Sequence, residues 1–259
     1  LIGSEIKSIF GEHDIHSKTT QATLFESQGA KNAFKKNIKN FLMFENLKDD
    51  TPSAVKIKLE EYSKMQSKGT IYKNLQFRLN CKTAESFGIE LPILYDDREI
   101  GENSLDSYTD EEQQKIVSLS KQERFFHWEL EFPQVFYDEN GNKKINPGFD
   151  CIIGNPPYVR QETIKEFKQH MQLSEQNSLG LKNFEIPSKS DLSCYFYYHG
   201  LNYLKDYGML GFIASDGWMS HDYGKSMQQV MLNKCNIDTL MRTEFNVFGD
   251  ADIKTITTI

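Results

Sequence analysis

Four consecutive residues suited to holding a planar amine, Asn155, Pro156, Pro157 and Tyr158, stand directly after the apolar run 149–153. An amino group joined to a π-system shares its lone pair with that system, so it attacks an electrophilic methyl group poorly. The Asn155 side-chain oxygen and the Pro156 carbonyl could each accept one N–H bond and draw the nitrogen towards a tetrahedral geometry. This arrangement indicates methyl transfer to an exocyclic amine or an amide by positioning and electrostatic preorganisation, without a covalent intermediate.

The other residues of the string support the same chemistry. Two prolines hold the carbonyl rigidly, because φ is fixed and neither residue has a competing N–H. The Tyr158 ring can stack on the plane of the substrate. At average usage such a tetrapeptide arises by chance in only about one chain in a thousand of this length. The alternative is a tight Pro-Pro turn with a packed tyrosine.

The second half of the chain predicts the elements that position this string. The run 149–153 ends at Gly154, as expected of a buried strand, and α/β sheets place ligand sites beyond the carboxyl ends of their strands. Further apolar patterns predict helices over 192–204 (closing at Tyr207–Gly208) and 223–234, and strands over 209–214, 237–245 and 253–259. The alternation of strand and helix predicts an α/β fold.

The first half predicts helices. Apolar residues recur at helical spacing over 30–47, 52–65 and 70–87, with Thr51–Pro52 as the start of the second helix and Gly88 after the third. Residues 88–108 predict a loop, and Thr109 opens another helix with acidic residues in its first turn. We therefore expect a mostly helical insertion or support region over 1–124 and part of an α/β catalytic domain over 125–259.

Composition excludes several classes of protein. Of the 259 residues, 26% are charged and 38% hydrophobic, which excludes a disordered or fibrous chain. No apolar run approaches the roughly 18 residues of a membrane span, and no secretory signal is visible, so we expect a soluble cytosolic chain. The four cysteines, Cys81, Cys151, Cys194 and Cys235, form no metal-ligand spacing, so we expect no metal site and reduced thiols. Cys151 and Cys194 lie within apolar patterns that predict core positions.

Charge is distributed unevenly along the chain. The net charge is −7, which argues against a generic nucleic-acid binder. Residues 31–82 nevertheless carry +7 and residues 85–139 carry −11. The basic block could meet a polyanion, although a solvated helical face is the simpler interpretation.

The sequence resembles a known family. The stretch 149–162, FDCIIGNPPYVRQE, is similar to motif IV of the amino-group DNA methyltransferases, above all the large adenine-specific methylases of single-chain restriction-modification systems (type IIG and relatives). The similarity continues through 190–215, which match the fifth and sixth motifs, and 244–259, which match the eighth. Residues 125–136 are similar to the lead-in of these proteins, and 20–90 are weakly similar to their helical insertion.

The resemblance implies a partial Rossmann-like methyltransferase sheet and methylation of adenine N6 in double-stranded DNA, with S-adenosylmethionine as donor, in a bacterial cytosol. The target base would leave the stack to reach the site. Asn155, Pro156 and Pro157 would hold its amino group, and Tyr158 and Phe248 would contact its two faces. For Phe248 an ordinary core position is the alternative. Asn155 and Asp191 would also contact the donor.

The sequence departs from the family at the donor loop. The family carries a glycine-rich turn and an acidic residue on the next strand, but the sixteen glycines here include no GxG. Because the chain begins at Leu1 and its last residues predict an unfinished strand, we expect an internal fragment, with the donor loop upstream and a target-recognition domain downstream. No acid-acid-Lys nuclease pattern is present. The fragment alone should be inactive, and its incomplete sheet should favour self-association.

Two other functions remain open from the residues alone. One is a methyltransferase that acts on RNA or on a protein glutamine amide, since similar tetrapeptides occur there. The other is a module that binds DNA or a protein without catalysis, which the missing donor loop favours for this chain.

Overall fold

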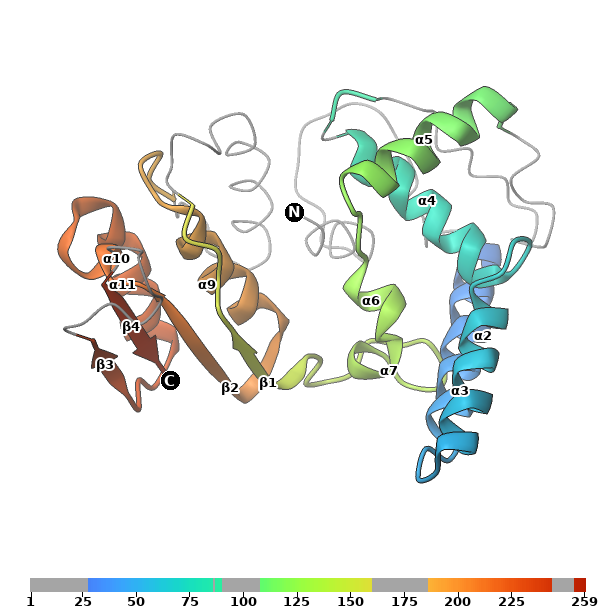
Figure 1. Ribbon diagram of the computed structural model, residues 1–259, viewed down its shortest axis with the longest axis horizontal. Helices are drawn as coiled ribbons and strands as arrows, with labels where there is room; N and C mark the ends of the chain where they lie inside the picture. Colours follow the sequence, from blue (N-terminus) through green and yellow to red (C-terminus); the bar gives the residue numbers. More distant parts are fainter. Residues whose placement is uncertain (1–27, 86, 90–107, 160–185, 244–253) are drawn as a thin grey trace. The chain divides into compact units, whose positions relative to one another are not determined.

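The computed structural model describes residues 28–85, 87–89, 108–159, 186–243 and 254–259 (Figure 1). The chain forms two compact units that divide between Ile145 and Asn146. Residues 125–145 belong to the first unit, so the boundary lies later along the chain than the expected one at 124. Each unit is described by itself below.

The first unit is helical in its described part. Its helices are α2 (Gln28–Glu45), α3 (Pro52–Met65), α4 (Ile71–Glu85), α5 (Asp110–Gln122), α6 (Trp128–Glu131) and α7 (Pro133–Phe136). The two predicted helix starts are confirmed. The Thr51 hydroxyl accepts from the Ala54 N–H at 3.1 Å, and Thr109 and Glu112 form a reciprocal capping box. These caps satisfy backbone donors that the helices cannot pair themselves.

Helix α4 lies at the centre of this unit. Ten of its fifteen residues are buried, whereas α3 buries none. The prediction of helix α3 is thus confirmed, but its apolar residues Val55 and Leu59 remain exposed. The hydroxyls of Tyr62 and Tyr72 both donate to the Glu131 carboxylate, which joins α6 to α3 and α4.

The second unit is the predicted mixed α/β fold. Strands β1 (Phe149–Gly154), β2 (Leu204–Ser215), β3 (Leu240–Arg242) and β4 (Thr255–Thr258) form a sheet in the order β1-β2-β4-β3 (Figure 1). β1 is parallel to β2, and β4 is antiparallel to both β2 and β3. The helical elements are α9 (Leu192–Tyr203), α10 (Gly217–Ser220), the 3₁₀ turn η2 (Asp222–Gly224) and α11 (Lys225–Lys234). The carboxyl ends of β1, β2 and β3 therefore meet at one edge.

One face of this sheet carries the core. Side chains of α9 and α11 pack with Phe212, Ala214 and Ile256 of the sheet and with Trp218. The second strand starts at Leu204 rather than Met209, because α9 ends at Tyr203 and Leu204 already pairs with Phe149 of β1. The pairing register then shifts before Met209 pairs with Cys151, and Tyr207, which lies in the shifted stretch, has a left-handed φ of 64°. The aromatic run of α9 supplies much of this core, as its apolar pattern predicted.

The prediction that β1 is buried is wrong. Strand β1 is one of the two edge strands of the described sheet, Cys151 is exposed, and Ile153 is 83% exposed. The pairing register places Ile153, Met209 and Met241 on the sheet face opposite α9 and α11. All three are exposed. An apolar run predicts a strand, but it cannot tell whether both faces of that strand are covered.

Candidate active site

The predicted tetrapeptide forms the segment that follows β1 at the carboxyl edge of the sheet. Gly154 pairs with Phe212, so Asn155 lies where β2 continues towards Ser215. The Tyr158 hydroxyl donates to the Ile213 carbonyl at 3.3 Å, which ties the segment to β2. The structure thus places these four residues together at the edge where the sequence predicted a site.

The acceptors for a planar amine remain available. Asn155 is exposed, and its side chain makes no hydrogen bond within the described residues. The Pro157 carbonyl accepts from the Val159 N–H at 3.0 Å, but no backbone N–H of the described residues donates to the Pro156 carbonyl. Pro156 itself is buried, which fixes the backbone between the exposed Asn155 and Pro157. The amide oxygen and one carbonyl are the two acceptors that the proposed geometry needs.

Tyr158 is held as a protonated phenol. Its ring is half-buried, and burial raises the pKa of the hydroxyl above its usual value. The hydroxyl therefore remains a donor to the Ile213 carbonyl at neutral pH. This bond fixes the ring orientation relative to β2, as a stacking platform requires.

Asp191 lies beside the tetrapeptide. It precedes helix α9, and the N–H of the next residue, Leu192, donates to the Val159 carbonyl at 3.2 Å. The half-buried Asp191 carboxylate accepts from the Tyr223 hydroxyl at 2.8 Å. The structure therefore places Asp191 beside the tetrapeptide, with Tyr223 as one of its partners; its contact with the methyl donor stays a prediction.

Sequence reasoning missed two further charged residues at this edge. Asp216 directly follows β2, and Arg242 ends β3. The Arg242 Nε donates to Asp216 Oδ2 at 2.6 Å. The position of Asp216 after an apolar strand was a usable signal, because the same rule located Asn155. The predicted Phe248 lies outside the described residues.

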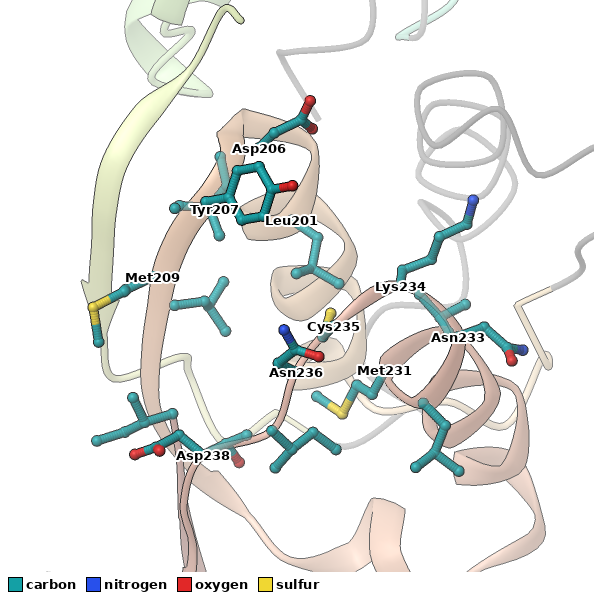
Figure 2. A pocket seen from close by; sticks show the side chains of 18 of the residues that line it. Leu201, Asp206, Tyr207, Met209, Met231, Asn233, Lys234, Cys235, Asn236 and Asp238 are labelled. Carbon is teal, nitrogen blue, oxygen red and sulfur yellow. The ribbon is translucent and has the colours of Figure 1, made fainter.

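A cavity of about 820 Å³ lies elsewhere in the second unit (Figure 2). It is lined by the first half of β2, including Tyr207 and Met209, and by residues from the end of α11 to Asp238. Tyr158 instead contacts Ile213 in the second half of β2. The cavity is therefore separate from the candidate active site.

Neither a metal centre nor a membrane span is found in the described ranges. No group of three or more His, Cys, Asp or Glu side chains there could hold a metal ion. All four cysteines are free thiols, and Cys194 is buried as predicted. In the same residues no helix combines the length and hydropathy needed to cross a bilayer.

Several curated proteins are similar to this chain. The type II methyltransferase M.BstVI of Geobacillus stearothermophilus is 29% identical over 112 residues, which are 42% of this chain and 18% of that protein. M.XhoI of Xanthomonas vasicola, also a type II methyltransferase, is 35% identical over 83 residues, 32% of this chain and 14% of that protein. A putative type II restriction enzyme and methyltransferase of Methanocaldococcus jannaschii is 28% identical over 128 residues, 49% of this chain and 9% of that protein.

The chain thus spans less than a fifth of the length of these relatives. A family model covers much more of it: residues 12–248 match the Eco57I restriction-modification methylase. This match includes both units and the whole Asn155–Tyr158 segment. The chain therefore belongs to the Eco57I restriction-modification methylase family.

Proposed function

We propose that this chain carries the target-amine half of the active site of a DNA methyltransferase that modifies adenine N6 within a restriction-modification system. The observation that supports the proposal is the exposed Asn155 amide, which makes no hydrogen bond to the described residues, beside a Pro156 carbonyl that accepts no backbone N–H from them. The family membership supports methyl transfer, and the geometry of two acceptors and a tyrosine ring favours a flat aromatic amine.

The residues act by position and electrostatics. The Asn155 oxygen and the Pro156 carbonyl each accept one N–H of the adenine amino group, which withdraws its lone pair from the ring and aims it outward. Tyr158 stacks on the base after it has left the duplex. Phe248 is proposed as the second contact of the base. No side chain forms a covalent bond with the substrate.

S-adenosylmethionine is the proposed donor, because it supplies an electrophilic methyl group when bound. Asn155 and the half-buried Asp191 carboxylate offer acceptors to its N–H or O–H groups. The sequence has no GxG turn for close backbone approach. The residues of this chain therefore complete the target side of the site and supply single contacts to the donor rather than the glycine-rich turn.

The proposed partner is double-stranded DNA in a bacterial cytosol. The +7 charge of residues 31–82 supports contact with phosphates. RNA or a glutamine amide is the alternative substrate, because both offer a planar nitrogen that two acceptors could hold. A non-catalytic binding role is the second alternative, which the missing donor turn favours for this chain alone.

The test is methyl incorporation by the full-length protein with radiolabelled donor and three substrates: duplex DNA, RNA and a glutamine-containing protein. We expect label in DNA only, recovered as N6-methyladenine after digestion. Asn155→Ala should reduce turnover at least about 100-fold, the effect of removing one preorganised polar contact. Asn233→Ala is the matched control, because Asn233 is exposed and lines the separate cavity. Wild-type turnover by Asn155→Ala, or label only in RNA or protein, would refute the proposal.

A further inference from the structure

Asp191 occupies a helix-capping position without capping the helix. It is the N-cap of α9, but its side chain accepts no hydrogen bond from the first turn. Aspartate is among the residues most favoured for that bond, and Thr51 and Thr109 form it at their own helices. The Asp191 carboxylate instead accepts from the Tyr223 hydroxyl at 2.8 Å. A local preference is set aside here for another contact, as happens at functional sites.

Tyr223 is placed for this contact by two neighbours. At Gly217 an added Cβ would lie 2.5 Å from the Tyr223 hydroxyl oxygen, so the glycine leaves room for the hydroxyl in this position. The His221 ring stacks on the Tyr223 ring with centroids 5.7 Å apart and planes at 16°. His221 Nδ1 in turn lies 2.8 Å from the Gly217 carbonyl oxygen, so Nδ1–H donates to it. These contacts support the ring orientation in which the hydroxyl reaches Asp191.

The direction of this hydrogen bond is also defined. Burial raises the pKa of Tyr223 well above its usual range, and the bond to the Asp191 carboxylate raises it further. The phenol stays protonated and donates, and the carboxylate accepts. The backbone bond from Leu192 to Val159 holds this pair next to Tyr158.

We propose that Tyr223 is a positioning residue, which holds the Asp191 carboxylate ready to accept an N–H or O–H group of the methyl donor beside Asn155. The proposal rests on the proposed function, because it assigns the contact to the donor of that reaction. A fixed carboxylate binds such a group at a lower entropic cost than a mobile one. Asp191 would thus act in donor binding, and Tyr223 through Asp191.

The test compares Tyr223→Phe, which keeps the stacked ring and removes only the hydroxyl, with Tyr195→Phe in the full-length protein. The Tyr195 hydroxyl is buried and has no hydrogen-bond partner in the described part of the chain, so its removal is a matched control. We expect Tyr223→Phe to raise the dissociation constant of S-adenosylmethionine, measured by calorimetric titration without DNA, about 10-fold, the scale of one hydrogen bond to a charged group, and the KM for the donor to rise in parallel. The kcat at saturating donor and the KM for DNA should change less than about twofold, and Tyr195→Phe should change none of these quantities.

A double-mutant cycle separates positioning from a structural role. If Tyr223 acts through Asp191, adding Tyr223→Phe to Asp191→Ala should raise the donor KM no further. Additive effects, an unchanged donor KM, or a fall in kcat alone would overturn the proposal. Asp191→Asn keeps an acceptor for Tyr223 but loses the charge, so it should raise the donor KM by itself. This variant tests the role of the carboxylate even if Tyr223→Phe fails to fold. If the Tyr223 and Asp191 variants contradict this proposal while Asn155→Ala is inactive, the proposed function is still supported. If Asn155→Ala is active, the proposed function itself is refuted.

Discussion

The Arg242 guanidinium and the Asp216 carboxylate join the ends of two strands that are not neighbours in the sheet. Arg242 ends β3 and Asp216 follows β2, while β4 lies between these strands. Arg242 Nε and Nη2 each lie 2.6 Å from Asp216 Oδ2. The Asp216 side chain is only 15% exposed, and its N–H donates to the Lys254 carbonyl at 3.1 Å just before β4. The pair therefore links three strands at the edge that carries Asn155.

This linkage predicts a measurable contribution to stability. Arg242→Gln should lower the free energy of unfolding by about 1 kcal/mol, because the guanidinium is half-exposed and solvent screens the pair. The loss should shrink at high salt, which weakens the ion pair in the unsubstituted chain. Urea unfolding at low and high sodium chloride measures both effects.

The exposed pair Lys225–Asp222 supplies the control for this experiment. Its side chains are 73% and 94% exposed, so Lys225→Gln should leave the unfolding midpoint unchanged. Equal unfolding midpoints for Arg242→Gln and Lys225→Gln would mean that the Arg242–Asp216 pair does not contribute to the free energy of unfolding.

Sequence reasoning predicted the candidate site but not the long-range contacts that hold its residues in place. The strand before Asn155, the helix starts at Thr51 and Thr109, and the α/β alternation all follow from local rules that short patterns express. The contacts of Asp191 with Tyr223 and of Asp216 with Arg242 join residues 32 and 26 positions apart. Such pairs depend on strand order and on the insertion of β4 between β2 and β3, which no local pattern encodes. The same limit explains the error at Cys151 and Ile153.

A buried histidine should make the helical unit sensitive to acid. His127 is 1% exposed, its Nε2–H donates to Asn80 Oδ1 at 2.7 Å, and its Nδ1 has no partner among the residues that the structure describes. Burial lowers the pKa of His127 to about 3 in the folded chain, against about 6.5 when unfolded. The unfolded state therefore binds the extra proton first, and stability falls as the pH drops from about 6.5 towards 3.

The matching variant is His127→Gln, whose amide can still donate to Asn80. Between pH 7 and pH 5 the unsubstituted chain should lose about 2 kcal/mol more unfolding free energy than the variant does. Denaturant titrations at the two pH values measure the difference. Parallel pH dependences in the two proteins would show that His127 is protonated as readily when folded as when unfolded.

The lysines of α2 provide the test for contact with DNA phosphates. Lys36 and Lys39 are exposed, Lys35 is half-buried, and none of the three forms an ion pair within the described residues. Reversing all three to glutamate should flatten the slope of log affinity against log salt in the full-length protein. Lys64→Glu is the control, because Lys64 is already paired with Glu61. An unchanged slope would mean that these three lysines face solvent and do not contact DNA phosphates.

The exposed face of the sheet predicts self-association of the 259-residue chain. Ile153, Met209 and Met241 are 83%, 58% and 54% exposed on the face away from α9 and α11, and β1 is an edge of the described sheet. Apolar patches and open strand edges both favour pairing with a second copy. Sedimentation velocity should show dimers or larger species, and Ile153→Thr with Met209→Lys should shift them to monomer. A monomer at all concentrations for the unsubstituted chain would contradict this.

The last prediction concerns donor binding by this chain alone. Tight binding of S-adenosylmethionine needs a backbone turn that approaches its amino and carboxylate groups closely, and an acidic partner for its ribose hydroxyls. The sixteen glycines include no GxG turn. Asp191 is the carboxylate that we assign to the donor, and a single contact of this kind supports only weak affinity. Calorimetric titration of the 259-residue chain should therefore give a dissociation constant weaker than about 10 μM, roughly −7 kcal/mol, and the chain should transfer no methyl groups to DNA. A tighter constant would mean that the donor is held by residues other than those assigned here, and Asp191→Ala would then leave it unchanged.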